Sequence, residues 1–251
     1  MALLCLCRRQ RGNFASKTGK NCRERLPLQR KGIVIEMMET LEIIKSSKII
    51  AIARGVYGDA LVSASLALYE GGVCAFEVTF EQDRPDGEAE TARNIALLTE
   101  KLPRDAVVGA GTVMTAKQVG VAREAGARFI ISPNTSREVI EETKRLKMVS
   151  IPGALTPTEI AAAYAFGADI VKVFPAGSMG VGYFKDVKAP FKHIPLAAVA
   201  GITKENIGAF SKAGAVAFGI SSTLYNKEAI ASGDLAAVRM TAEELYRALG
   251  E

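Results

Sequence analysis

The amino-acid sequence predicts a (β/α)8 barrel, in which eight parallel strands alternate with helices. Three observations support this fold: short apolar runs of strand length recur, helical patterns separate them, and one helix–glycine–strand junction returns several times. The chain has 251 residues, of which 49% are hydrophobic, enough for one large barrel with a sizeable core. An open doubly wound sheet is the alternative fold, because a strand count from sequence alone is imprecise.

Eight apolar runs correspond to the strands of the barrel. Each is rich in β-branched or aromatic residues, and most end in Gly, Pro or Ser. They are KIIAIA (48–53), VCAFEVTF (73–80), AVVGAG (106–111), RFIIS (128–132), MVSIPG (148–153), DIVKVFP (169–175), LAAVAG (196–201) and AVAFGIS (215–221). Their spacing of roughly 20 to 30 residues is that of strand–helix units.

Segments with helical periodicity lie between these strands, for example residues 58–72, 115–127 and 156–168. Each closes with a glycine where a helix C-cap is expected. The junction recurs as EGGVCAFE, EAGARFI, AFGADIV and KAGAVAF: a helix ends, Gly turns the chain, and the next strand starts. This repetition favours a regular strand–helix architecture.

Residues 1–37 form a basic extension that we separate from the predicted barrel domain, residues 38–251. Residues 1–38 hold nine basic and two acidic residues, a net charge of +7, and the other 23 basic and 25 acidic residues leave −2. The extension has three interpretations: a transit peptide, a disordered basic arm for nucleic acid, or a segment upstream of a true start at Met37 or Met38. We favour the last. The nearly neutral barrel domain argues against nucleic acid as a partner.

Composition also limits the class of protein. No apolar run reaches the roughly 18 residues that a membrane span needs, so we expect a soluble protein without a membrane partner. Cys74 is the single cysteine outside the extension, which excludes a disulfide framework there and fits a reducing cytoplasm. The chain has one histidine, His193, whereas metal-dependent cleavage enzymes usually use several, so we expect no metal site.

Lys172 stands in the middle of the apolar strand DIVKVFP. Because side chains alternate along a strand, Ile170, Lys172 and Phe174 share one face and the valines the other. Valines suit the helix-covered face, so Lys172 is expected to point into the barrel. There its burial would lower the pKa of the ammonium group toward neutrality.

Glu77 is the second charged residue expected inside the barrel. In VCAFEVTF, alternation places Ala75, Glu77 and Thr79 inward, and the phenylalanines outward. A buried carboxylate and a buried amine are each costly alone, so we expect Glu77 and Lys172 to share one polar pocket. A structural ion pair, or a lysine that extends to the rim, is the alternative interpretation.

The ends of the other strands supply polar and small residues, and barrels of this type carry their chemistry at those ends. These residues are Thr112 in GAGTV, Pro133 and Asn134 in ISPN, Gly201 in AGI, and Gly219, Ser221 and Ser222 in GISS. The loops after the seventh and eighth strands commonly bind phosphate through backbone N–H groups. Ordinary turn chemistry is the alternative for them.

Five segments, GGVCAFEVTF, VVGAGTVMTAKQV, GARFIISPN, IPGALTPTEI and DIVKVFPA, resemble in this order the motifs of the KDPG/KHG aldolase family. The resemblance extends from about Ile49 to Leu224. It implies a class I, Schiff-base aldolase on a (β/α)8 barrel, a homotrimer without a cofactor. The expected reaction cleaves 2-dehydro-3-deoxy-6-phosphogluconate to pyruvate and glyceraldehyde 3-phosphate.

The resemblance also implies roles for individual residues. Lys172 matches the imine-forming lysine, and Glu77 the general acid/base. Thr112 matches a threonine that helps to hold the pyruvate part, and Arg54 an arginine of some members. The remaining residues of the expected substrate site are Pro133, Phe174, Val199, Gly201, Gly219, Ser221 and Ser222.

Two departures from the family pattern leave the substrate open. Many members carry an arginine for the substrate carboxylate four residues after the catalytic glutamate, but this chain has Glu81 there. Arg54 is then the remaining candidate, with Arg84 a weaker one. In the seventh strand, Val199 and Ala200 replace the threonine and a glycine of a common PTGG motif.

Galactonate-type relatives resemble this chain in having valine there. The alternatives are therefore the same chemistry on 2-dehydro-3-deoxy-6-phosphogalactonate or on 4-hydroxy-2-oxoglutarate. A catalytically silent barrel that binds a phosphorylated metabolite is a further alternative.

Overall fold

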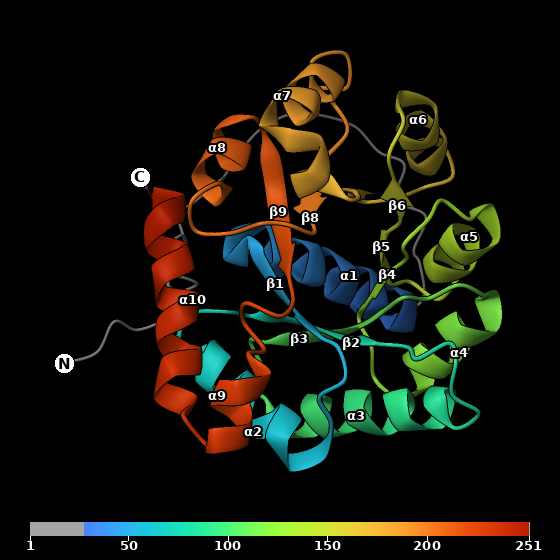
Figure 1. Ribbon diagram of the computed structural model, residues 1–251. Helices are drawn as coiled ribbons and strands as arrows, with labels where there is room; N and C mark the ends of the chain where they lie inside the picture. The colour runs from blue at the N-terminus through green and yellow to red at the C-terminus, as the bar shows by residue number, and fades with distance from the viewer. Residues whose placement is uncertain (1–27, 251) are drawn as a thin grey trace.

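The computed structural model describes residues 28–250, with side chains from Glu36 onward, and its parallel strands form a ring surrounded by helices (Figure 1). Within this range the strand order is β5-β4-β3-β2-β1-β9-β8-β7-β6. The strands are β1 (Ile49–Ala53), β2 (Ala75–Thr79), β3 (Val107–Gly111), β4 (Phe129–Ile131), β5 (Val149–Ile151), β6 (Gly153–Ala154), β7 (Val171–Val173), β8 (Leu196–Val199) and β9 (Ala215–Ile220).

β5 and β6 are two parts of one predicted strand, MVSIPG, and they close the ring. β5 pairs with β4, and β6 pairs with β7. Pro152, which has no N–H to donate, separates the two parts. The backbone N–H of Lys172 donates to the Pro152 carbonyl at 2.9 Å, and that of Ile170 to the Ser150 carbonyl at 3.3 Å. All eight predicted strands are therefore present in a closed barrel, and the open doubly wound sheet is excluded.

The described helices comprise one that precedes β1 and others that follow strands and pack outside the ring (Figure 1). They are α1 (Leu28–Ser47), α2 (Gly58–Glu70), α3 (Gly87–Lys101), α4 (Ala116–Glu124), α5 (Arg137–Arg145), α6 (Pro157–Ala165), α7 (Ala176–Lys188), α8 (Ile207–Lys212), α9 (Lys227–Ser232) and α10 (Leu235–Gly250). Several begin with a side-chain cap: Thr115, Ser136 and Thr156 each accept a hydrogen bond from the backbone N–H three residues later.

The glycines of the repeated junction turn the chain as predicted. Gly72, Gly126, Gly167 and Gly214 have φ angles of 103°, 100°, 107° and 99°. Residues with a Cβ rarely adopt such angles, so each glycine permits a turn that leads from a helix directly into the next strand.

The buried side chains divide into two sets, as strand alternation predicts. Phe76, Val78 and Phe80 of the β2 region lie in the larger cluster, between the strands and the helices. Ala75 and Ile170 lie in the smaller cluster, inside the barrel, together with Ile50, Val107, Phe129 and other residues. The odd- and even-numbered positions of β2 and β7 therefore face opposite sides of the barrel wall.

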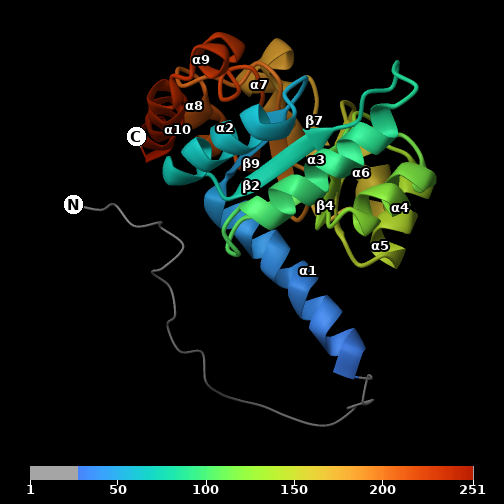
Figure 2. The same cartoon turned by 90° about the horizontal axis from the view of Figure 1, so that it is seen from below.

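α1 lies at the end of the barrel where the strands begin (Figure 2). Ile44 is fully buried and belongs to the cluster inside the barrel, with Ile50 and Ala75. Arg128, before β4, donates a hydrogen bond to the Glu36 carbonyl at 3.0 Å. The helix begins at Leu28, upstream of the predicted domain boundary at Met38, and residues 1–27 of the predicted extension lie outside the described residues. None of the described helices is long and apolar enough to cross a membrane.

Candidate active site

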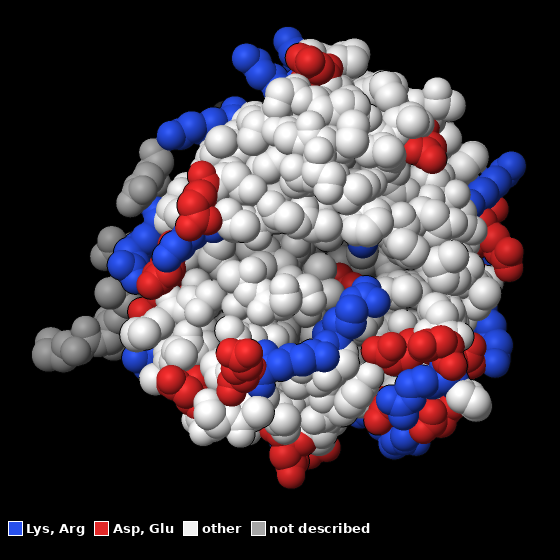
Figure 3. Space-filling view, viewed as in Figure 1, with Lys and Arg blue, Asp and Glu red and all other residues white. Residues whose placement is uncertain are grey.

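The face turned away from α1 is hollowed at its centre, and basic and acidic groups are visible within the hollow (Figure 3). The carboxyl ends of the parallel strands open on this face. Side chains that point inward near the carboxyl ends of the strands can therefore reach a ligand in this hollow.

Lys172 lies in the middle of β7 with 7% of its surface exposed. Its strand neighbours are Gly153 in β6 and Ala197 in β8. Its Nζ lies 4.7 Å from the centre of the Phe174 ring. Burial lowers the pKa of Lys172, and the Arg54 charge adds to this effect while Glu77 opposes it. The amine is therefore neutral more often than an exposed lysine is.

Glu77 lies in β2 with 2% of its surface exposed. Its carboxylate occupies the space beside Gly111 of β3, where any side chain would overlap with it. Its Oε2 atom is buried without a hydrogen-bond partner. Burial raises the pKa of Glu77 to about 6, although the charges of Lys172 and Arg54 act in the opposite direction.

Glu77 and Lys172 share the pocket without a direct ion pair in the described part of the chain. Each charge nevertheless shifts the pKa of the other, so the two groups are electrostatically coupled. The structure therefore gives no support to a structural ion pair, and the 7% exposure of Lys172 argues against a lysine that extends to the rim.

Arg54 and Thr112, which the resemblance assigned separately to the substrate site, are in contact at the ends of their strands. Arg54 follows β1 and is exposed, and its Nη2 donates a hydrogen bond to Thr112 Oγ1 at 3.0 Å. Thr112 follows β3 and has a φ of 55°. The Arg54 guanidinium is the cation whose charge acts on both Lys172 and Glu77.

Two glutamines beside this pair were missed in the sequence analysis. Gln82 Nε2 donates to the Thr112 carbonyl at 2.7 Å. Gln118 Nε2 donates in turn to Gln82 Oε1 at 3.1 Å, and Gln118 Oε1 accepts from the Met114 N–H at 2.8 Å. Gln118 lies in the segment VVGAGTVMTAKQV, and Gln82 lies outside the five segments. Neither was given a role, because their contact depends on how the loop after β2 approaches the start of α4.

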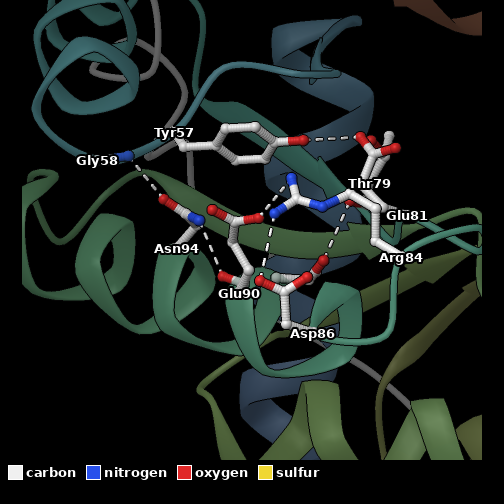
Figure 4. Close-up of polar contacts among 9 residues, drawn as sticks. Tyr57, Gly58, Thr79, Glu81, Arg84, Asp86, Glu90 and Asn94 are labelled. Carbon is white, nitrogen blue, oxygen red and sulfur yellow. Dashed lines mark hydrogen bonds and ion pairs between the residues drawn. The ribbon is translucent and has the colours of Figure 1, made fainter.

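Glu81 and Arg84 belong to a separate polar cluster between the start of α2 and the start of α3 (Figure 4). Glu81 Oε1 accepts a hydrogen bond from Tyr57 Oη at 2.9 Å. Arg84 forms ion pairs with Glu90 at 2.8 Å and Asp86 at 3.3 Å, and lies over the Tyr57 ring. Arg84 is thus occupied by two carboxylates, which leaves Arg54 as the better candidate for the substrate carboxylate.

Val199 and Gly219 lie in β8 and β9, and β8 pairs with β7, the strand of Lys172. They are paired in neighbouring strands β8 and β9, and a side chain at Gly219 would lie 2.9 Å from both Val199 methyl groups and from Ile52 Cδ1. Just beyond, Ala200 and Gly201 have φ angles of 72° and 69°. The Ala200 carbonyl accepts a hydrogen bond from the Gly177 N–H at 2.8 Å, which joins this loop to the start of α7.

The other predicted site residues lie at the same ends of the strands. Pro133 follows β4, and its carbonyl fills the space beside Gly153, the strand neighbour of Lys172. Ser221 and Ser222 follow β9, and the Ser221 carbonyl accepts the N–H groups of Leu224 and Tyr225 in a turn. Within residues 28–250, no group of three or more His, Cys, Asp or Glu residues is arranged to hold a metal ion.

Comparison with known proteins gives consistent matches. The family model described as KDPG and KHG aldolase matches residues 40–241. A probable 2-dehydro-3-deoxy-6-phosphogalactonate aldolase from Rhizobium meliloti is 35% identical over 188 residues, which are 74% of this chain and 85% of the relative.

Solved structures agree with this match. The native KDPGal structure has a TM-score of 0.71 and 29% identity, and the alignment covers 80% of this chain and 93% of that one. The KDPG aldolase of Legionella pneumophila, with pyruvate captured as a covalent carbinolamine intermediate, has a TM-score of 0.70 and covers 82% of this chain and 97% of its own. Its identity is 24%, so this likeness concerns the fold.

Proposed function

The chain belongs to the KDPG and KHG aldolase family, and from this premise we propose that it is a class I aldolase whose Schiff base forms on Lys172. The observation that carries the proposal is the buried Lys172, with a lowered pKa, beside the buried and unpaired Glu77 carboxylate. A neutral amine inside a closed barrel is a nucleophile for a ketone carbon.

Lys172 supplies the electron sink for cleavage. Its neutral Nζ attacks the C2 ketone of the substrate and gives a carbinolamine, which loses water to become an iminium ion. The electron pair of the C3–C4 bond then moves toward the iminium and forms an enamine. The carbinolamine captured with pyruvate in the Legionella pneumophila protein is the type of adduct that this step requires.

Glu77 serves the proton transfers. It takes the proton of the C4 hydroxyl, directly or through a water molecule, so that the C4 fragment leaves as an aldehyde. The enamine is protonated at C3, and hydrolysis of the imine releases pyruvate and restores the amine. A carboxyl pKa of about 6 suits this role, because the group can accept and return a proton near neutral pH.

For the substrate we propose 2-dehydro-3-deoxy-6-phosphogalactonate, with the gluconate epimer as the competing candidate. The valine at position 199, in the strand next to that of Lys172, and the 35% identical galactonate-type relative favour the first, whereas the resemblance alone favours the gluconate epimer. Arg54 and Thr112 would hold the carboxylate. The loops that carry Gly201, Ser221 and Ser222 would receive the phosphate.

The test is covalent trapping with pyruvate and borohydride, read by mass spectrometry of peptides. We expect a three-carbon adduct on Lys172 and none in Lys172→Met. Lys188→Met is a matched control, because Lys188 is also a partly buried lysine with a pKa lowered by burial, but it donates to carbonyls beyond the end of α7. If the unmodified protein forms no adduct, the proposal is wrong and the silent barrel is favoured.

The substrate assignment has its own measurement. Cleavage of the two epimers should be faster for the galactonate form, and Val199→Thr should shift the ratio of kcat/KM toward the gluconate form by roughly tenfold, the scale of one changed pocket contact. If the ratio of kcat/KM for the two epimers is the same in Val199→Thr and in the unmodified protein, Val199 has no role in substrate selection.

A further inference from the structure

Thr112 has an unusual backbone conformation. Its φ of 55° lies in the left-handed region, where a β-branched residue is an outlier. Such a conformation persists when surrounding contacts hold it, and it is characteristic of sites that need a fixed geometry. The contacts that hold Thr112 are therefore of functional interest.

Two side chains bind Thr112, one at its hydroxyl group and one at its backbone carbonyl. Arg54 donates to its hydroxyl at 3.0 Å, and Gln82 donates to its carbonyl at 2.7 Å. Gln82 is exposed and would be free to move, but Gln118 donates to its amide oxygen at 3.1 Å. Gln118 is only 5% exposed and is fixed by the Met114 N–H.

We propose that Gln82 is a positioning residue for the substrate carboxylate, which acts through Thr112 to fix the guanidinium of Arg54. The inference rests on the proposed function, in which Arg54 binds that carboxylate. Arg54 is a long, exposed side chain, so its fork of N–H groups recognises a carboxylate only if it is held in place.

The charges around the pocket make this positioning necessary. Lys172 must be neutral to attack, so it offers no full positive charge to the carboxylate at that step. Arg84 is engaged by Glu90 and Asp86, and the family's usual arginine is replaced here by Glu81, whose carboxylate is held by Tyr57. Arg54 remains as the cation whose charge acts on the two catalytic groups.

The experiment measures the pyruvate concentration that gives half-maximal trapping on Lys172. Gln82→Met keeps the length of the side chain and removes both amide hydrogen bonds. We expect the half-saturating concentration to rise about fivefold, the effect of losing the one hydrogen bond that reaches Thr112, with an unchanged limiting yield. Asp83→Asn, a change of the exposed neighbour in the same loop, should leave both quantities unchanged.

A double-mutant cycle with Arg54→Met shows whether Gln82 acts through Arg54. In the Arg54→Met background, Gln82→Met should have no further effect on half-saturation. The inference is contradicted if Gln82→Met still changes half-saturation in the Arg54→Met background. It is also contradicted if Gln82→Met alone lowers only the limiting yield, or leaves the half-saturating concentration within twofold of that of the unmodified protein. Absence of any adduct in the unmodified protein would instead contradict the proposed function.

Discussion

Lys172 and Glu77 are buried inside the barrel, where the charged form of each side chain is destabilised by the loss of water. Burial moves their pKa values toward each other, downward for the lysine and upward to about 6 for the glutamate. Neither gains the full benefit of an ion pair, since no such bond joins them among the described residues. The same desolvation that makes the pair suitable for imine chemistry therefore reduces the stability of the folded protein.

The pH dependence of stability tests this cost. The folded-state pKa of Glu77, about 6, is above its ordinary value of 4.5, so the folded protein binds this proton more tightly than the unfolded chain. The contribution of the protonated Glu77 to the free energy of unfolding is fully present below pH 4.5 and is lost as the pH rises through 6. Glu77→Gln should therefore raise the free energy of unfolding by about 2 kcal/mol at pH 8 and by little at pH 4.

Urea unfolding at the two pH values measures the difference, with the exposed Glu124→Gln as control. A gain of equal size at both pH values would show that the ionised carboxylate is not the source. The same variant should lower kcat for cleavage, and the remaining activity should lack the acidic limb, which we expect near pH 6 in the unmodified protein.

The sequence predicted the orientation of those residues whose direction depends only on their position within a strand. Lys172 and Glu77 were found because the two-residue period of a strand fixes which side chains share a face. Gln82 was not found, because its contact with Thr112 requires the loops after β2 and β3 to approach in one geometry. The left-handed backbone of Thr112 has no signature in its residue type.

After the end of β8, an alanine adopts a backbone conformation that normally favours glycine. Ala200 stands where the common PTGG motif has a glycine, and its φ is 72°. Its carbonyl is fixed by the Gly177 N–H, so the conformation is held by the contact with α7. A left-handed alanine costs free energy that a glycine would not.

Ala200→Gly should therefore stabilise the protein by about 1 kcal/mol, after part of the relieved strain is offset by the greater entropy of an unfolded glycine. Ala198→Gly is the matched control, since Ala198 is a buried residue inside β8 and its replacement should destabilise. Thermal unfolding of both variants measures this. A lower melting temperature for Ala200→Gly would mean that the Ala200 methyl group makes a compensating contact.

Two other elements differ from the sequence expectation for physical reasons. The fifth predicted strand is divided into β5 and β6, because Pro152 cannot donate to the ladder. α1 begins at Leu28, within the segment that was expected to precede the domain. Its later part is stabilised by the barrel it covers, a tertiary effect that residue patterns before Met38 do not show.

For the whole molecule, the fold separates stability from chemistry. α1 packs where the strands begin, and its Ile44 joins the cluster inside the barrel. Lys172 and Glu77 lie in the middle of β7 and β2, and Arg54 and Thr112 follow the ends of β1 and β3. The closed ring was predictable because strand–helix repeats leave few topologies. The predicted homotrimer concerns contacts between chains and stays a prediction.

Ile44→Ala tests this separation. Ile44 is fully buried in the cluster inside the barrel, so its truncation should leave a cavity and reduce the free energy of unfolding by about 3 kcal/mol. Ile43, the partly buried neighbour on α1, is the control, and Ile43→Ala should cost less. In both variants the half-saturating pyruvate concentration should match that of the unmodified protein, measured at a temperature at which they are folded. A rise in that concentration for Ile44→Ala alone would show that the packing under the barrel sets the geometry of Lys172, and the two ends of the molecule would then be coupled.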